Sequence, residues 1–228
     1  MNLLCGSFAV VVALMYNDLT LAFWLIVAGI VFDFFDGFVA RLLHSSSAIG
    51  VQLDSLADVI TSGLAPAAVL WQVCLQTEPC WLPETWKPGY GVFVLAAFSA
   101  LRLAKFNIDE TQTVEFCGLP TPAGSLLCAS LGMLWQQGAV ALSSDGVLLI
   151  AVLTSLLLVS PIRMFALKFH GFGWRGNEVR YLFLLASIVL IIILRTYAIP
   201  VIIVLYIVVS AVRWLCMRSG NPDKAPKA

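Results

Sequence analysis

The chain has 228 residues, of which 61% are hydrophobic and 11% are charged, and its mean hydropathy is +0.95. This composition excludes an ordinary soluble globular domain and is typical of a membrane protein. The formal net charge is zero, with 13 basic and 13 acidic residues, so the total charge gives no support to a role in nucleic-acid binding.

Eight apolar runs follow one another along the chain. Each is close to the roughly 20 residues that a helix needs to cross a bilayer core, although the first is short. The runs cover 2–16, 19–42, 50–75, 90–107, 120–140, 146–169, 179–195 and 197–217. We therefore predict an all-α integral membrane protein, a bundle of about eight transmembrane helices. A single transmembrane domain would cover 1–218, and the short polar tail 219–228 would be disordered.

The distribution of lysine and arginine predicts the orientation of the spans. With eight spans both termini lie on one side, and only Lys87 and Arg195 of the 13 basic residues then fall on the other side. Because basic residues favour the cytoplasmic side, we expect both termini to face the cytoplasm from the inner (cytoplasmic) membrane.

Four aspartates interrupt the second and third runs, at the ends that this orientation places toward the cytoplasm. Asp33 is paired with Asp36, and Asp54 with Asp58. Residues three or four apart share one face of a helix, so antiparallel neighbours would bring all four carboxylates together. Ionised groups at bilayer depth are costly, and Arg41 alone cannot neutralise four carboxylates, which makes structural ion pairing the weaker explanation. Such oxygen ligands favour Mg²⁺ or Mn²⁺, and four of them suit two ions.

The aspartates belong to a longer gapped pattern, Asp33-x2-Asp36-Gly37-x2-Ala40-Arg41-x8-Gly50-x3-Asp54-x3-Asp58. With every position and the eight-residue spacer present, it resembles the motif of the CDP-alcohol phosphotransferases, integral membrane enzymes of phospholipid synthesis. The resemblance implies a catalytic domain with a six-helix core followed by two C-terminal helices.

The same resemblance assigns roles to motif residues. It implies that Asp58 is the general base, and whether Asp58 is base, metal ligand or both is left open. Gly37, Ala40 and Gly50 match positions that make room for the cytidine nucleotide in the family. Arg41 is suited to phosphate because its guanidinium offers a planar fork of donors.

Two further segments bear on the acceptor alcohol. Residues 99–107 and 116–123 resemble blocks of the CDP-diacylglycerol–serine O-phosphatidyltransferases, and residues 159–164 do so more weakly. This resemblance implies transfer of a phosphatidyl group from CDP-diacylglycerol to L-serine with release of CMP, by a homodimer surrounded by membrane lipids.

Four residues in or near these segments are candidates for binding the acceptor. Arg102, Lys105 and Arg163 could each supply a cation for the serine carboxylate, and Asn107 could bind nucleotide or serine. The alternative for the three basic residues is topology with snorkelling toward anionic headgroups, and the alternative for Asn107 is a helix cap.

Other interpretations remain open at this level. Glycerol 3-phosphate or inositol phosphate as acceptor would favour more basic residues near the motif than His44, which is accompanied only by serines. A cation transporter would use the aspartates as a midplane site, and the adjacent Arg41 argues against that. Cys74 and Cys80 flank one loop and would pair only in an oxidising compartment.

Overall fold

The computed structural model describes residues 1–42, 47–81, 83, 88–108, 115–165 and 177–220. Within these ranges the chain forms nine α-helices: α1 (Asn2–Val11), α2 (Leu19–Leu42), α3 (Ala48–Asp58), α4 (Ala65–Leu75), α5 (Val94–Ile108), α6 (Thr121–Gln136), α7 (Ser144–Leu158), α8 (Glu178–Leu194) and α9 (Ala198–Gly220). A π-helical segment, Val12–Tyr16, extends α1, and a second, Val59–Leu64, joins α3 to α4. Short 3₁₀ segments, Pro88–Phe93 and Arg195–Tyr197, lead into α5 and α9.

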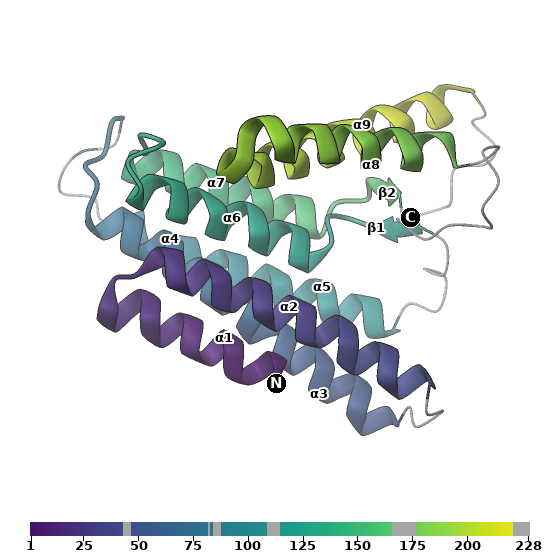
Figure 1. Ribbon diagram of the computed structural model, residues 1–228, viewed down its shortest axis with the longest axis horizontal. Coiled ribbons are helices and arrows are strands. Elements are labelled where there is room, and N and C mark those ends of the chain that lie inside the picture. The colour runs from purple at the N-terminus through teal and green to yellow at the C-terminus, as the bar shows by residue number, and fades with distance from the viewer. Residues whose placement is uncertain (43–46, 82, 84–87, 109–114, 166–176, 221–228) are drawn as a thin grey trace.

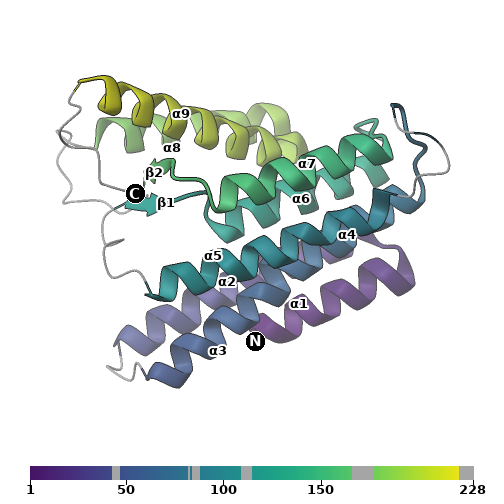
Figure 2. The same ribbon diagram turned by 180° about the vertical axis from the view of Figure 1, so that it is seen from behind.

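The helices run side by side along the long axis of the molecule (Figure 1). α8 and α9 lie along one side of the bundle and α1, α2 and α3 along the other, with α4 to α7 between them (Figures 1 and 2). The end of α2, the start of α3, the end of α5 and two short strands all lie at one end, which we call the sheet end. The connections from α1 to α2, from α4 to α5 and from α6 to α7 lie at the opposite end.

Four described helical segments are long and apolar enough to cross a membrane. They are Leu19–Val39, Ile49–Leu75, Gly89–Ile108 and Glu178–Cys216, and two shorter apolar helices cover Asn2–Tyr16 and Ser144–Leu158. The prediction of an all-α, multi-pass membrane protein is therefore confirmed. The number of eight spans stays a prediction.

The predicted run 146–169 differs from the structure, because α7 ends at Leu158. Pro161 explains the early end, since proline has no N–H to donate and its ring clashes with the preceding turn. The chain then enters β2 (Arg163–Phe165), which pairs antiparallel with β1 (Glu115–Cys117). Gly118 follows β1 at φ +77°, and a Cβ there would collide with the Leu158 carbonyl oxygen, so this turn requires glycine. The α5–α6 and α7–α8 connections are thereby bound to one another at the sheet end.

Small residues bring the helices of the carboxylate region into close contact. A Cβ added at Gly29 of α2 would lie 2.6 Å from Thr61 Cγ2, and one at Gly63 would lie 3.0 Å from Ser99 Cβ. At these positions the small residues allow the close approach that is common between membrane helices. Side chains such as Phe23 and Leu70 fill the interior beside them.

Candidate functional site

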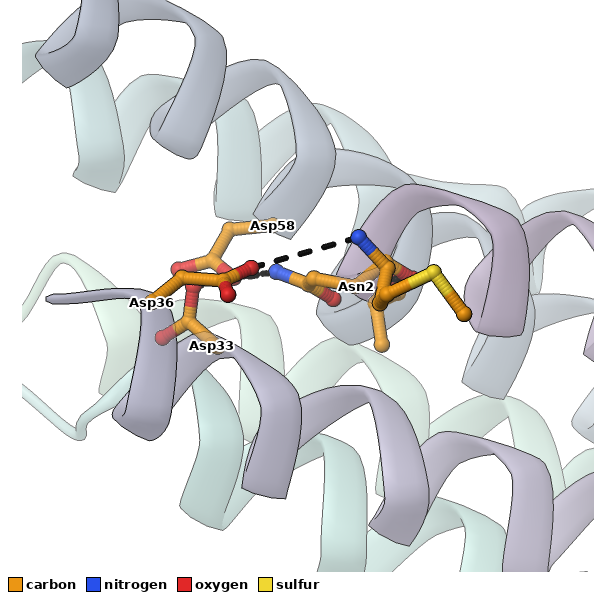
Figure 3. Close-up of polar contacts among 6 residues, drawn as sticks. Asn2, Asp33, Asp36 and Asp58 are labelled. Carbon is orange, nitrogen blue, oxygen red and sulfur yellow. Dashed lines mark hydrogen bonds and ion pairs between the residues drawn. The ribbon is translucent and has the colours of Figure 1, made fainter. Parts of the chain in front are cut away.

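The four aspartates of the motif lie on two neighbouring elements. Asp33 and Asp36 project from α2, and Asp54 and Asp58 from the last two turns of α3. Figure 3 shows Asp33, Asp36 and Asp58 grouped around the start of α1. Asp33 and Asp58 are half-buried, whereas Asp36 and Asp54 are exposed. The convergence expected from antiparallel helices is thus present for the carboxylates that Figure 3 labels.

The side chain of Asn2 joins Asp33 to Asp58, and the sequence motif did not predict this residue as part of the site. Asn2 Nδ2 donates to Asp33 Oδ1 at 3.0 Å and to Asp58 Oδ1 at 2.9 Å (Figure 3). The amino group of Met1 lies 3.9 Å from Asp36 Oδ2. One signal was available: Asn2 is the only amide side chain in the apolar run 2–16.

The chemistry of these groups fits a hard divalent cation. Among the described residues, no three acidic, histidine or cysteine side chains stand together in a way that could hold a metal ion. The space between Asp33 and Asp58 is occupied by the N–H groups of Asn2, which place partial positive charge between two carboxylates. Asn2 Oδ1 is buried and has no hydrogen-bond partner among the described residues. Carboxylate oxygens with a spare amide oxygen beside them are the ligands that Mg²⁺ and Mn²⁺ prefer.

The residues matched to the nucleotide lie on both sides of the α2–α3 connection. A Cβ added at Gly37 would meet no atom of the described residues within 4 Å, so among those residues the backbone of α2 is open at this position. Gly50 belongs to the first turn of α3, where its N–H donates to Ser47 Oγ at 3.0 Å in an N-terminal cap. The side chains of Ala40 and Arg41 lie outside the described part of the structure.

A pocket of about 400 Å³ lies between α5, the end of β1 and the end of α7. Its lining residues are Arg102, Lys105, Phe106, Ile108, Cys117, Leu158, Val159, Ser160 and Pro161. Arg102 is buried, and its Nη1 donates to Thr121 Oγ1 at 3.1 Å. Its guanidinium carbon lies 5.9 Å from the centre of the Phe106 ring. Arg102 also interacts electrostatically with Asp58.

The other two acceptor candidates lie in different places. Asn107 Nδ2 donates to Ser55 Oγ at 2.9 Å and so fastens the end of α5 to α3, between Asp54 and Asp58. Arg163 lies on β2, opposite Cys117 in the strand register, and its side chain is exposed. Of the four candidates, Arg102 and Lys105 are the ones that line the pocket.

The cysteine alternative is not supported. Cys74 and Cys80 are both free thiols, Cys74 buried and Cys80 exposed.

Comparison with known proteins identifies the family. The family model described as CDP-alcohol phosphatidyltransferase matches residues 1–160, which hold the carboxylates and most of the pocket. The chain is 32% identical to the CDP-diacylglycerol–serine O-phosphatidyltransferase of Bacillus subtilis strain 168, over 75% of this chain and 88% of that protein. It is 31% identical to the enzyme of that name from Helicobacter pylori strain 26695, over 86% of this chain and 80% of the relative. The enzyme of that name from Mycobacterium tuberculosis strain H37Rv is 34% identical, over 89% of this chain and 73% of the relative. The chain belongs to the CDP-alcohol phosphatidyltransferase family.

Proposed function

We propose that this protein is a phosphatidylserine synthase, which transfers a phosphatidyl group from CDP-diacylglycerol to the hydroxyl of L-serine and releases CMP. The relatives described above are named for this activity, and the chain matches most of the length of each. The observation that carries the proposal is the position of Arg102, which lines the pocket and interacts with Asp58. An acceptor bound by Arg102 would lie beside the carboxylate site.

The chemistry of serine suits the pocket. Serine is a zwitterion, so its carboxylate needs a cation, which Arg102 and Lys105 supply from one helix. Arg102 is held by Thr121 and by the face of Phe106, so its guanidinium is fixed before an acceptor arrives. The hydroxyl of Ser160, at the opposite wall, is suited to the serine ammonium.

The four carboxylates would hold Mg²⁺ or Mn²⁺, with two ions as the expected number. Bound there, the metal neutralises the pyrophosphate of the CDP-activated lipid, which otherwise repels an incoming nucleophile. Gly37 leaves the surface of α2 free of a side chain, which allows the nucleotide to lie against the helix backbone. We propose Asp33, Asp36 and Asp54 as the first metal ligands. Asp58 would act as general base and could also bind a metal ion.

We propose Asp58 as the general base that accepts the proton of the serine hydroxyl. The serine oxygen forms a bond to the phosphorus that carries the diacylglycerol, the P–O bond to CMP breaks, and CMP leaves with that electron pair. The hydroxyl proton would pass to Asp58, which interacts electrostatically with Arg102.

The membrane arrangement follows from the same proposal. We propose eight transmembrane spans, a homodimer, and an inner-membrane orientation in which both termini and the sheet end face the cytoplasm. Arg102, Lys105 and Arg163 all lie toward the sheet end, which supports this orientation because basic residues favour the cytoplasmic side.

The first experiment is a measurement of CMP release by the purified protein in detergent with CDP-diacylglycerol, Mn²⁺ or Mg²⁺, and a panel of acceptors. Release with L-serine, but not with glycerol 3-phosphate or inositol phosphate, is expected. Release with a phosphorylated acceptor instead would keep the family chemistry and overturn the serine assignment. No release with any acceptor would overturn the activity itself.

A second experiment tests the pocket through two exposed basic residues. Lys105→Ala should raise the KM for serine by about tenfold, because a charge-assisted contact contributes roughly 1.5 kcal/mol. The KM for CDP-diacylglycerol should change far less. Arg163→Ala, which removes an equal charge from β2, is the matched variant and should change the serine KM less than Lys105→Ala. Equal effects on both substrates in Lys105→Ala would place Lys105 outside the serine site.

A further inference from the structure

We propose that Asn2 is a positioning residue of the carboxylate site, which holds Asp33 of α2 and Asp58 of α3 in a fixed relation through its side-chain amide. The inference rests on the proposed function of those carboxylates. It adds to the site a residue from α1, outside the motif, which begins at Asp33.

The hydrogen bonds of Asn2 show which group sets its orientation. Both contacts of Nδ2 are made to carboxylates, at 3.0 and 2.9 Å, and they come from two different helices. The Oδ1 atom of the same amide is buried without a partner among the described residues. An amide that merely filled space would turn to satisfy its oxygen as well as its nitrogen. The carboxylates therefore fix this amide, and the amide in turn holds them together.

The packing of α1 explains how Asn2 reaches this depth. Asn2 is buried, with 4% of its surface exposed, and its backbone oxygen accepts from Thr61 Oγ1 at 3.1 Å. A Cβ at Gly6 would collide with Thr61, so the first turns of α1 can lie directly against the π-helical segment after Asp58. Gly29 provides the matching space on α2, because a Cβ there would lie 3.3 Å from Asn2 Oδ1.

The side chain of Asn2 is uncharged, which suits a residue that holds two carboxylates together. Two carboxylates side by side repel one another, and a donor between them reduces that repulsion. A lysine at this position would do so by neutralising the site, which would compete with a divalent cation. An amide supplies donors while leaving the full negative charge of the carboxylates for the cation.

The test compares Asn2→Leu with the unchanged protein. Leucine has a similar volume and no hydrogen-bonding group, so it keeps the packing and removes the link. We expect kcat to fall about 10- to 100-fold, as for other residues that orient metal ligands, with the KM for serine changed less than about threefold. Mn²⁺ affinity should fall in parallel when it is measured without substrate, from the loss of the free Mn²⁺ electron paramagnetic resonance signal. Ser7→Ala is the matched control, since Ser7 donates only to the Leu3 carbonyl on the same helix.

A second variant protects the test against misfolding. Gly29→Ala changes neither Asn2 nor any aspartate, but its methyl group would press against Asn2 Oδ1 and Thr61. It should lower kcat and Mn²⁺ affinity by similar factors. Gly132→Ala, which crowds Val69 instead, should leave the Mn²⁺ affinity unchanged. Unchanged kcat and Mn²⁺ affinity in Asn2→Leu would overturn the inference. An unchanged kcat per folded molecule in Gly29→Ala, with activity lost only because less protein folds, would also overturn the inference. Failure of the unchanged protein to bind Mn²⁺ would count against the proposed metal site instead.

Discussion

This helical bundle holds two polar clusters, one at the end away from the sheet and one around the start of α1, and they are built on opposite principles. At the end away from the sheet, Gln136 Oε1 accepts from the backbone N–H groups of Leu19 and Thr20, and Gln136 Nε2 donates to the Asn17 carbonyl. The side-chain amides of Asn17 and Gln76 also donate to each other. Every one of these donors meets an acceptor. We call this group the amide cluster.

The carboxylates toward the sheet end have no such balance. Asp33, Asp36, Asp54 and Asp58 are acceptors gathered near acceptors, and the donors among them come from the first two residues of the chain. A polar group whose needs are met stabilises a fold, whereas like charges held together are costly and persist where a ligand uses them. The comparison favours a structural role for the amide cluster and supports the proposal that the carboxylates bind a ligand.

The largest expected effect comes from the carboxylates. Asp33→Asn should lower CMP release about 1,000-fold, because the proposed metal would contribute several kcal/mol to the transition state and each 1.36 kcal/mol is tenfold in rate. The melting temperature should stay the same or rise, since a negative charge leaves a crowded group. Turnover of the unchanged protein measured in this variant would contradict the metal-ligand assignment.

A smaller and opposite effect is expected in the amide cluster. Gln136→Ala removes the acceptor of two backbone N–H groups at the start of α2 and should lower the free energy of unfolding by about 1 kcal/mol. The specific activity of the folded protein should not change. Thermal unfolding and CMP release on the same preparation check both parts, and a fall in kcat without a fall in stability would blur the distinction between the clusters.

The smallest effect concerns a single aspartate outside the site. Asp18 caps α2, because its Oδ1 accepts from the Leu21 N–H at 2.8 Å. Asp18→Ala should lower stability by about 0.5–1 kcal/mol and leave turnover unchanged, which makes it the matched partner of Asp33→Asn on the same helix. A loss of turnover here would mean that activity responds to α2 as a whole rather than to its carboxylates.

Much of the fold could be predicted from the apolar runs. Runs such as 19–42 and 197–217 lie close to the bounds of α2 and α9, because a helix in lipid needs an uninterrupted apolar stretch. The end of α7 was predictable from Pro161 but was hidden by the apolar residues that follow it. The pairing of β1 with β2 was not predictable, because strands of three residues carry no periodic pattern.

The candidate site divides in the same way. The carboxylates were predictable because their spacing sets their face on each helix. Asn2 was not, because its contact depends on how deeply α1 packs against Thr61 and Gly29, which no spacing along the chain encodes. The pocket around Arg102 likewise depends on β1 and the end of α7, two elements far from α5 in the sequence.

The π-helical segment Val59–Leu64 rotates the side-chain faces of α3 relative to those of α4, the two halves of the third predicted span. A π turn carries an extra residue compared with an α turn, and one residue corresponds to about 100° of rotation around a helix. The face of α3 that carries Asp54 and Asp58 is therefore rotated relative to the face by which α4 packs into the interior. Deletion of one residue from this segment would make a regular α-helix of the whole span, and it would turn the aspartates away from α2 while α4 kept its packing.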